Sequence, residues 1–192
     1  MKEAIKAMRG VLKRYKIDEV STENRLTASF YQRDVLAVAP DLLGKLLVVR
    51  QSEGLYRRFL INEAEAYRGE EDRACHAARG RTPRTEVMYA EGGKVYVYFV
   101  YGMYWMLNIV TGKENDPQAV LIRGLEGLTG PGRITRELGI NSEFYGEDLV
   151  KSERIWIEDN GEKVRFITTP RIGIDYAGSP WKEKHWRFVV ER

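Results

Sequence analysis

Two β-prone runs joined by a short turn constrain the fold more than any other part of the sequence. The runs are residues 95–101 and 105–110, and Gly102-Met103-Tyr104 lie between them. Valine, isoleucine, tyrosine and phenylalanine favour strands, and a short turn that contains glycine joins its flanking strands in antiparallel fashion. The sequence therefore predicts a β-hairpin with an aromatic tip, set in an antiparallel sheet.

Further strand patterns lie on both sides of this hairpin. Alternating or β-prone runs predict strands at residues 42–50, 56–67, 119–125 and 187–190. We expect the first two of these strands to pair across a turn at Ser52-Glu53-Gly54. Residues 154–158 and 163–167 flank Asn160-Gly161, a dipeptide typical of tight turns, and so predict a second hairpin.

The helical patterns are short. Residues 29–38 predict a helix that Pro40 stops, with Asp41 capping the element that follows. A second helix is expected at residues 133–138, after a glycine-rich loop at 130–132. The chain has neither an internal repeat nor a low-complexity segment, so the sequence predicts a mixed α+β domain built on antiparallel strands.

Length and composition indicate a globular protein with one domain. The 192 residues are 43% hydrophobic and 31% charged, which lies in the ordinary range for folded domains. The single cysteine, Cys75, excludes an internal disulfide, and the N-terminus lacks the apolar core of a signal peptide, so we expect an intracellular protein. The most apolar stretch, residues 95–107, is too short for a transmembrane helix, which needs roughly 20 residues, so we expect no membrane association.

The first 25 residues form a separate pattern ahead of a domain at 26–192. Apolar residues recur there at helical spacing and basic residues cover most of the remaining face, which predicts a basic amphipathic helix. Two interpretations stay open for this helix: its apolar stripe packs on the core with a solvated outer face, or its basic face touches DNA.

Two acids and a phenol share one face of the strand at residues 56–67. The two-residue period of a strand places Glu63, Glu65 and Tyr67 on one side, with alanines opposite. Such a face suits a catalytic site, but a strand whose charges face solvent would show the same pattern. Paired carboxylates also occur in glycosidases, so a sugar-cleaving hydrolase of another substrate class is a rival hypothesis.

A cationic loop follows this strand. Four arginines lie in it without an intervening acid: Arg73, Arg79, Arg81 and Arg84. Phosphates are natural ligands for such a patch, and we expect Arg81 and Arg84 to bind them. The alternative is an ordinary solvated loop whose arginines pair with acids elsewhere.

Six aromatic residues crowd the predicted hairpin: Tyr96, Tyr98, Phe99, Tyr101, Tyr104 and Trp105. Aromatic side chains beside arginines are typical of nucleic-acid sites, because stacking contributes about 1–3 kcal/mol per base while guanidinium groups hold phosphate. A buried strand pair would account for some of these aromatics. The net charge of +3 permits a polyanionic partner without requiring one.

Several motifs keep a fixed order from about residue 26 to the C-terminus. They are Leu43-Gly44-Lys45-Leu46-Leu47, Glu63-Ala64-Glu65-Ala66-Tyr67, His76, Arg81-Thr82-Pro83-Arg84, Tyr96-Val97-Tyr98, Tyr101-Gly102-Met103-Tyr104, Asn108, residues 120–123 and Arg171-Ile172-Gly173-Ile174. Together they resemble the motifs of the alkyladenine (methylpurine, or 3-methyladenine) DNA glycosylases. The resemblance implies a curved antiparallel β-sheet, a partly open barrel surrounded by helices, from which the aromatic hairpin protrudes.

The resemblance also implies roles for individual residues. Glu65 is similar to the family's water-activating carboxylate, Arg123 to an arginine that positions that water near a phosphate, and the Ile172 carbonyl is expected to help. The positions that resemble the family's base pocket and wedge are Tyr67, His76 and Tyr98 for the aromatic walls, Asn108 for discrimination against guanine, Tyr101 for intercalation, and Met103 and Tyr104 for the minor groove.

These roles imply a repair enzyme that acts on double-stranded DNA. It would flip an alkylated or deaminated purine from the helix, hydrolyse its N-glycosidic bond and leave an abasic site in the DNA. The enzyme is expected to act as a monomer and to need no cofactor. No lysine in the matched motifs stands out as a Schiff-base nucleophile, so strand cleavage is not expected. The other rival hypothesis is a non-catalytic minor-groove binder whose hairpin kinks DNA.

Metal and thiol chemistry are not expected. The two histidines and the cysteine, His76, His185 and Cys75, lack the spacing of metal ligands. Because Cys75 and His76 are adjacent, both cannot point the same way on a regular strand, which disfavours a cysteine nucleophile. We interpret Cys75 as a small buried residue.

Overall fold

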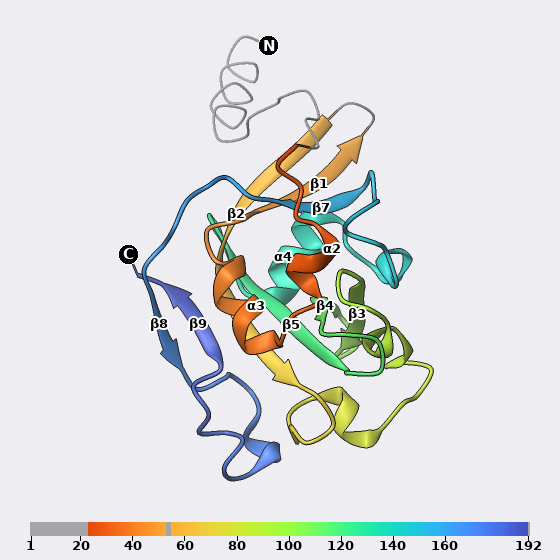
Figure 1. Cartoon of the computed structure of the whole chain (residues 1–192), viewed down its shortest axis with the longest axis vertical. Helices are drawn as coiled ribbons and strands as arrows, with labels where there is room; N and C mark the ends of the chain where they lie inside the picture. The colour runs from red at the N-terminus through yellow and green to blue at the C-terminus, as the bar shows by residue number, and fades with distance from the viewer. Residues whose placement is uncertain (1–22, 53–54, 192) are drawn as a thin grey trace.

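The structure is a computed structural model and describes residues 23–52 and 55–191 (Figure 1). The predicted N-terminal basic helix at residues 1–25 lies outside the described residues except for its last three positions. At that boundary Arg25 forms an isolated antiparallel bridge with Glu158, and its guanidinium lies 4.6 Å from the ring centroid of Trp156.

A curled antiparallel sheet forms most of the described chain. Its strands are β1 (Leu46–Ser52), β2 (Leu55–Arg68), β3 (Val95–Val100), β4 (Tyr104–Thr111), β5 (Gln118–Leu125), β6 (Leu128–Thr129), β7 (Ile155–Glu158), β8 (Phe166–Thr169) and β9 (Arg187–Val190). The main order is β3-β4-β5-β2-β1-β7, while β9 pairs with both β2 and β8 and β6 pairs with β5. The predicted α+β class, with a curved antiparallel sheet as a partly open barrel, is confirmed.

Strand β2 is the centre of this arrangement because it pairs along its whole length. Its first half pairs with β1, and its second half lies between β5 and β9. Figure 1 shows β8 and β9 on one side of the molecule and the β3–β4 hairpin on the other. The acidic end of β2 is therefore enclosed by strands on both edges.

Two helices cover the inner face of the sheet. They are α3 (Val35–Leu42) and α4 (Pro131–Leu138). In α3 the fully buried residues are Val35, Val38, Ala39 and Leu42, whose spacing is that of one helical face. These side chains share a core with apolar residues of β2 and β5, and burial of each large aliphatic side chain contributes about 1.5–3 kcal/mol.

The predicted β3–β4 hairpin is confirmed. Its register runs from Val95 opposite Ile109 to Val100 opposite Tyr104. The turn between the strands contains Tyr101 and Gly102, and both have a positive φ, +53° and +66°.

The predicted helix at residues 29–38 is wrong in its bounds. Two helices occur there, α2 (Ala28–Tyr31) and α3, and Pro40 lies inside α3. The second helix begins at Val35 because the side chain of Asp34 accepts a 2.8 Å hydrogen bond from the amide of Leu36 and so caps the new N-terminus. Asp41, which was expected to cap the next element, lies within α3 and pairs with Arg33 at 2.8 Å.

The predicted hairpin around Asn160-Gly161 is also wrong. The turn itself forms, since Gly161 has φ +73° and donates a hydrogen bond to Asp159, but the strands on either side do not pair with each other. Strand β7 is fully buried and pairs with β1, whereas β8 is mostly exposed and pairs with β9. The strong turn dipeptide therefore marks a change of direction between two edges of the sheet.

Candidate active site

A cavity of about 980 Å³ lies between the β3–β4 hairpin, the cationic loop and residues 172–176. Strands β4 and β5 form its floor. It brings together most of the residues that the sequence singled out, because its walls include Tyr67, His76, Arg84, Tyr98, Tyr101, Asn108 and Arg123. The predicted positions that are absent from its walls are Glu65, Arg81, Met103 and Tyr104.

Glu65 lies directly behind this wall with no exposed surface. Its Oε2 accepts a 2.8 Å hydrogen bond from the hydroxyl of Tyr67, and its Oε1 accepts a 2.8 Å bond from the main-chain amide of Ile172. The Nε of Arg123 lies 3.5 Å from the same Oε1. Because these three neighbours all line the cavity, the carboxylate is one residue removed from the cavity, and the alternative of a solvent-facing strand is excluded.

The surroundings of Glu65 adjust its affinity for a proton. Burial raises the pKa of Glu65 above its usual value, while Arg123, the Ile172 amide and the Tyr67 hydroxyl act in the opposite direction. A buried carboxylate with a raised pKa is a stronger base than an exposed one once it is ionised. The chemistry suited to this carboxylate is therefore that of a proton acceptor.

An irregularity in β2 directs its acids into the site. The register between β2 and β5 shifts on both sides of Glu63, which pairs with Gly124. A Cβ on Gly124 would lie 2.4 Å from the side-chain oxygen of Asn62 and 2.7 Å from the Cβ of Glu63, so only glycine fits. The bulge thus requires a glycine directly after Arg123.

A buried ion pair, whose role the sequence did not reveal, fixes the segment that carries Ile172. Arg171 and Asp72 have no exposed side-chain surface, and their oxygen and nitrogen atoms meet at 2.5 and 2.9 Å. Arg171 also donates to the carbonyl of Ala66 at 2.9 Å, and its guanidinium lies 4.8 Å from the ring centroid of Tyr67. Arg171 belongs to a recognised motif, but nothing in the sequence around Asp72 indicated a buried partner.

The aromatic part of the cavity is built around His76. Its Nδ1 lies 2.8 Å from the hydroxyl of Tyr96, and its ring meets that of Tyr98 edge-on at 4.4 Å between centroids. Burial, together with the positive charges of Arg84 and Arg79, lowers the pKa of His76 to about 4. The imidazole is therefore neutral at neutral pH.

Asn108 lies deep in the same cavity and is almost fully buried. Its Nδ2 donates to the carbonyl oxygens of Tyr96 and Met106, at 3.2 and 3.3 Å. These bonds fix the side chain on β4 opposite the aromatic wall. The sequence placed Asn108 in the base pocket, and its position in the structure is compatible with that role.

The hairpin tip carries two exposed apolar side chains. Tyr101 is 87% exposed and Met103 is 62% exposed. A bulky residue with φ +53° is unusual and costs about 1–2 kcal/mol, so the left-handed conformation of Tyr101 is a candidate functional strain. Tyr104, by contrast, is half-buried against Gly132, where a Cβ would lie 2.7 Å from its ring.

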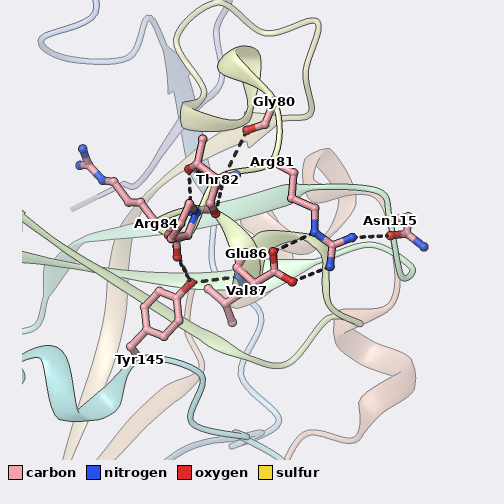
Figure 2. Close-up of polar contacts among 10 residues, drawn as sticks. Gly80, Arg81, Thr82, Arg84, Glu86, Val87, Asn115 and Tyr145 are labelled. Atoms are coloured by element: carbon pink, nitrogen blue, oxygen red, sulfur yellow. Dashed lines mark hydrogen bonds and ion pairs between the residues drawn. The ribbon is translucent and has the colours of Figure 1, made fainter.

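The arginines of the cationic loop differ in their surroundings. Arg81 forms an ion pair with Glu86 at 2.5 Å, and its guanidinium also donates a hydrogen bond to the side-chain oxygen of Asn115 at 3.4 Å. It lies outside the cavity wall. Figure 2 shows the Arg84 side chain extending away from this cluster. Arg84 lies 5.0 Å from the ring centroid of Tyr98.

Two further arginines reach the cavity from this loop. Arg73 and Arg79 line the cavity and are exposed, and in the described part of the chain neither has an ion pair. With Arg84 they form a cationic rim at the cavity mouth, which we call the arginine rim. Tyr176 also lines the cavity and is 71% exposed, and its hydroxyl donates to the carbonyl of Ala74, next to Arg73, at 3.1 Å. The sequence pattern did not single out Tyr176.

Cys75 is buried, as the sequence predicted. Burial raises the pKa of its thiol to about 12, so it carries no thiolate at neutral pH. Within residues 23–52 and 55–191 no three potential metal ligands are grouped as a site. Over the same ranges no helix is long and apolar enough to cross a membrane.

Comparisons with known proteins agree with the resemblance seen in the motifs. A family model described as methylpurine-DNA glycosylase matches residues 29–129 and 126–192. A protein of Sodalis glossinidius is 45% identical over 170 residues, which cover 85% of this chain and 95% of that protein. One of Desulfitobacterium hafniense (strain Y51) is 43% identical over 195 residues, 87% of this chain and 95% of its own, and both carry 3-methyladenine DNA glycosylase as a provisional name. The chain belongs to the methylpurine-DNA glycosylase family.

Proposed function

We propose that this protein is a DNA N-glycosylase that flips an alkylated or deaminated purine out of duplex DNA and hydrolyses its N-glycosidic bond. Glu65 activates the attacking water, and the product is an abasic site. The observation that carries this proposal is the position of Glu65, buried behind an aromatic cavity and held there by Tyr67 and Ile172. Family membership and the names of the relatives support the same reaction.

Duplex DNA reaches the site through the hairpin tip and the arginine rim. Moving a nucleotide out of the stack costs a few kcal/mol, and an inserted aromatic ring offsets part of that cost. Tyr101 suits this role because it is exposed at the tip and also borders the cavity. Arg73, Arg79 and Arg84 suit contacts to the backbone phosphates beside the flipped nucleotide.

The cavity favours a cationic, electron-poor base. Alkylation at a ring nitrogen gives the purine a positive charge, which aromatic faces attract by roughly 0.5–2 kcal/mol. Tyr67 and Tyr98 supply such faces, and His76 does so without a charge of its own because its pKa is lowered to about 4. A protonated imidazole would repel the same base.

Hydrolysis follows from the placement of Glu65. As the base leaves, positive charge develops on the sugar, and an ionised Glu65 stabilises it while accepting a proton from water. General-base assistance is typically worth about 10² to 10⁴ in rate. Among the described residues that line the cavity there is no lysine, which supports hydrolysis without a Schiff base and without strand cleavage.

An excision assay tests the proposal. Duplex oligonucleotides, each with one 3-methyladenine analogue, ethenoadenine or hypoxanthine, are incubated with the protein and then heated in alkali, which breaks the strand at an abasic site. We expect scission at the lesion only after alkali, abolished by Glu65→Gln with DNA binding retained. Intact strands for every lesion, with binding retained, would favour the minor-groove binder.

The same assay separates the glycosidase hypothesis. A sugar-cleaving hydrolase of another substrate class would release a chromophore from aryl glycosides and leave every oligonucleotide intact.

Light scattering of the protein with and without lesion duplex tests the expected monomer. One protein per duplex is the expected ratio.

A further inference from the structure

The structure contains a second buried acid beside Glu65 that the proposed reaction does not use. Glu63 is only 8% exposed and lies two residues before Glu65 on β2. Its Oε1 accepts a hydrogen bond from the Nε of Arg123 at 3.0 Å and another from the Nε of Arg187 at 2.7 Å. One carboxylate oxygen thus holds two guanidinium groups from two different strands.

The bond to Glu63 determines how Arg123 faces the cavity. Its Nε lies closer to Glu63, at 3.0 Å, than to Glu65, at 3.5 Å, so the hydrogen bond goes to Glu63. Arg123 lines the cavity, and in the described part of the chain its two terminal amino groups have no hydrogen-bond partner. These two terminal amino groups are therefore available to bind a phosphate or a water in the cavity.

Arg187 fixes Glu63 from the other side. It lies on β9 as the direct cross-strand partner of Glu65, and it also donates to the hydroxyl of Thr169 at 3.0 Å. Both Glu63 and Arg187 are thereby fixed to the sheet, and Glu63 has little freedom to follow Arg123 if that side chain moves. The acid acts as an anchor whose position the β2 bulge determines.

We infer that Glu63 is a positioning residue, which binds the Nε of Arg123 and keeps this arginine aimed into the cavity instead of closing onto Glu65. This inference rests on the proposed function, because it assigns Arg123 to the phosphate or water of that reaction. Without Glu63, Arg123 is free to shorten its existing 3.5 Å contact with Glu65 to a hydrogen bond. Such a bond would lower the pKa of Glu65, which makes its carboxylate a weaker proton acceptor, and would turn the arginine away from the substrate.

The inference predicts a specific kinetic pattern for Glu63→Gln. We expect the single-turnover excision rate to fall by about 10-fold to 100-fold, the range that misplacement of a catalytic side chain causes. Affinity for lesion duplex should stay the same or increase, because a negative charge beside the DNA is lost. The acid limb of the pH–rate profile should move to lower pH, since an arginine closer to Glu65 favours its ionised form.

The pH readout must account for every group around Glu65. The charged and titratable side chains that face it are Glu63 and Tyr67 on β2, Tyr98 on β3, Arg123 on β5, Arg171 next to Ile172, and Arg187 on β9. Only Glu63 changes in this variant, and both consequences of its loss, one fewer negative charge and a closer Arg123, move the limb in the same direction. A limb that stays in place would overturn the inference.

Glu158→Gln is the matched control. Glu158 is buried to a similar extent, at 6% exposed. Like Glu63 it binds the Nε of an arginine, in this case Arg58 on β2, with its Oε2 at 2.9 Å. It lies outside the cavity wall. A purely structural role for Glu63 predicts that both variants lower the melting temperature and that folded Glu63→Gln protein excises the base at the wild-type rate.

Two further variants extend the test, and the second of them, Arg123→Lys, applies even if Glu63→Gln does not fold. If Glu63 acts through Arg123, Glu63→Gln in an Arg123→Met background should change the rate by no more than about twofold, because the coupled effects do not add. Arg123→Lys retains the charge but lacks the Nε that Glu63 holds, so we expect it to lose as much rate as Arg123→Met. Excision by Arg123→Lys at the wild-type rate would overturn the inference.

The outcome is separable from that of the proposed function. If the wild-type protein excises no base, the proposed function fails and the inference with it. If the wild-type protein excises the base and Glu65→Gln does not, while Glu63→Gln matches wild type in rate and pH profile, only the inference fails.

Discussion

The main-chain amide of Ile172 donates a 2.8 Å hydrogen bond to Oε1 of Glu65, across a separation of 107 residues in the chain. This bond connects the central strand of the sheet with a segment that has no regular secondary structure at that point. The segment is held in place by the buried pair of Arg171 and Asp72. The orientation of the Glu65 carboxylate therefore depends on an ion pair that does not line the cavity.

Asp72→Asn should destabilise the fold strongly. The substitution leaves Arg171 buried without a countercharge, and removal of one partner from a buried ion pair typically costs about 3–5 kcal/mol. Urea unfolding at neutral pH measures this cost. Asp41→Asn is the control, because the exposed pair of Asp41 and Arg33 should contribute no more than about 1 kcal/mol. Equal losses in the two variants would contradict the role of the buried pair.

Tyr67→Phe should move the acid limb of the excision profile to higher pH. Burial raises the pKa of Glu65, and the Tyr67 hydroxyl partly opposes this by bonding to the charged form. Without that hydroxyl the pKa rises further, so the carboxylate loses its charge, and the enzyme its activity, at a higher pH than in the wild type. The measurement is the single-turnover rate across the pH range.

Tyr89→Phe is the control for this experiment. Tyr89 also donates to a carboxylate, Glu70, at 2.6 Å, but it lies outside the cavity wall. Its loss should leave the pH–rate profile where it is in wild type. A profile for Tyr67→Phe that also stays in place would contradict the contact with Glu65.

His76 should titrate far below the usual pH for histidine. Burial, then Arg84 and Arg79, lowers its pKa from the usual histidine value of 6.5 to about 4. Nitrogen-resolved NMR of the imidazole should show the neutral form from pH 5.5 upward. Because the depressed pKa means that folding favours the neutral ring, His76 contributes stability above its unfolded pKa, and this stability is lost as the pH falls towards 4. An imidazole that takes up its proton near pH 6.5 would contradict the buried, cation-flanked position.

Local patterns predicted much of this fold and site. The β3–β4 hairpin and the positions of β1, β2, β5 and β9 follow from β-propensity, alternation and turn residues, all of which act over a few residues. The placement of Glu65 beside an aromatic cavity also agrees with what the resemblance implied. Hairpin prediction failed at Asn160-Gly161 because a turn dipeptide specifies a change of direction but not the partner of the strand that follows.

The parts that could not be predicted depend on long-range contacts. Asp72 and Arg171 are 99 residues apart, and neither carries a local sign of burial. The pair of Arg81 and Glu86 is local, but it was not predicted either, because Glu86 lies just beyond the acid-free loop that the pattern singled out. A count of charges along the chain cannot show which arginines remain available to phosphate, whereas the structure places Arg73, Arg79 and Arg84 at the cavity.

Tyr101→Gly should separate stability from activity at the hairpin tip. The left-handed conformation of Tyr101 costs about 1–2 kcal/mol, while glycine adopts it freely but loses more conformational entropy on folding, by roughly 0.5–1 kcal/mol. The free energy of unfolding should therefore change by no more than about 1 kcal/mol, as measured in urea. Excision from a fully paired duplex should fall, because no side chain is left to enter the space of the flipped base.

The wedge role of Tyr101 also predicts on which DNA substrates Tyr101→Gly loses most of its excision rate. A lesion in a one-nucleotide bulge is already partly unstacked, so it needs less help to leave the helix, and its excision should fall less than that from a paired duplex. Tyr101→Phe retains the ring and should behave like wild type on both substrates. An equal loss on paired and bulged DNA would mean that Tyr101 contributes to the cavity wall and not to the displacement of the base, since both substrates use the same cavity.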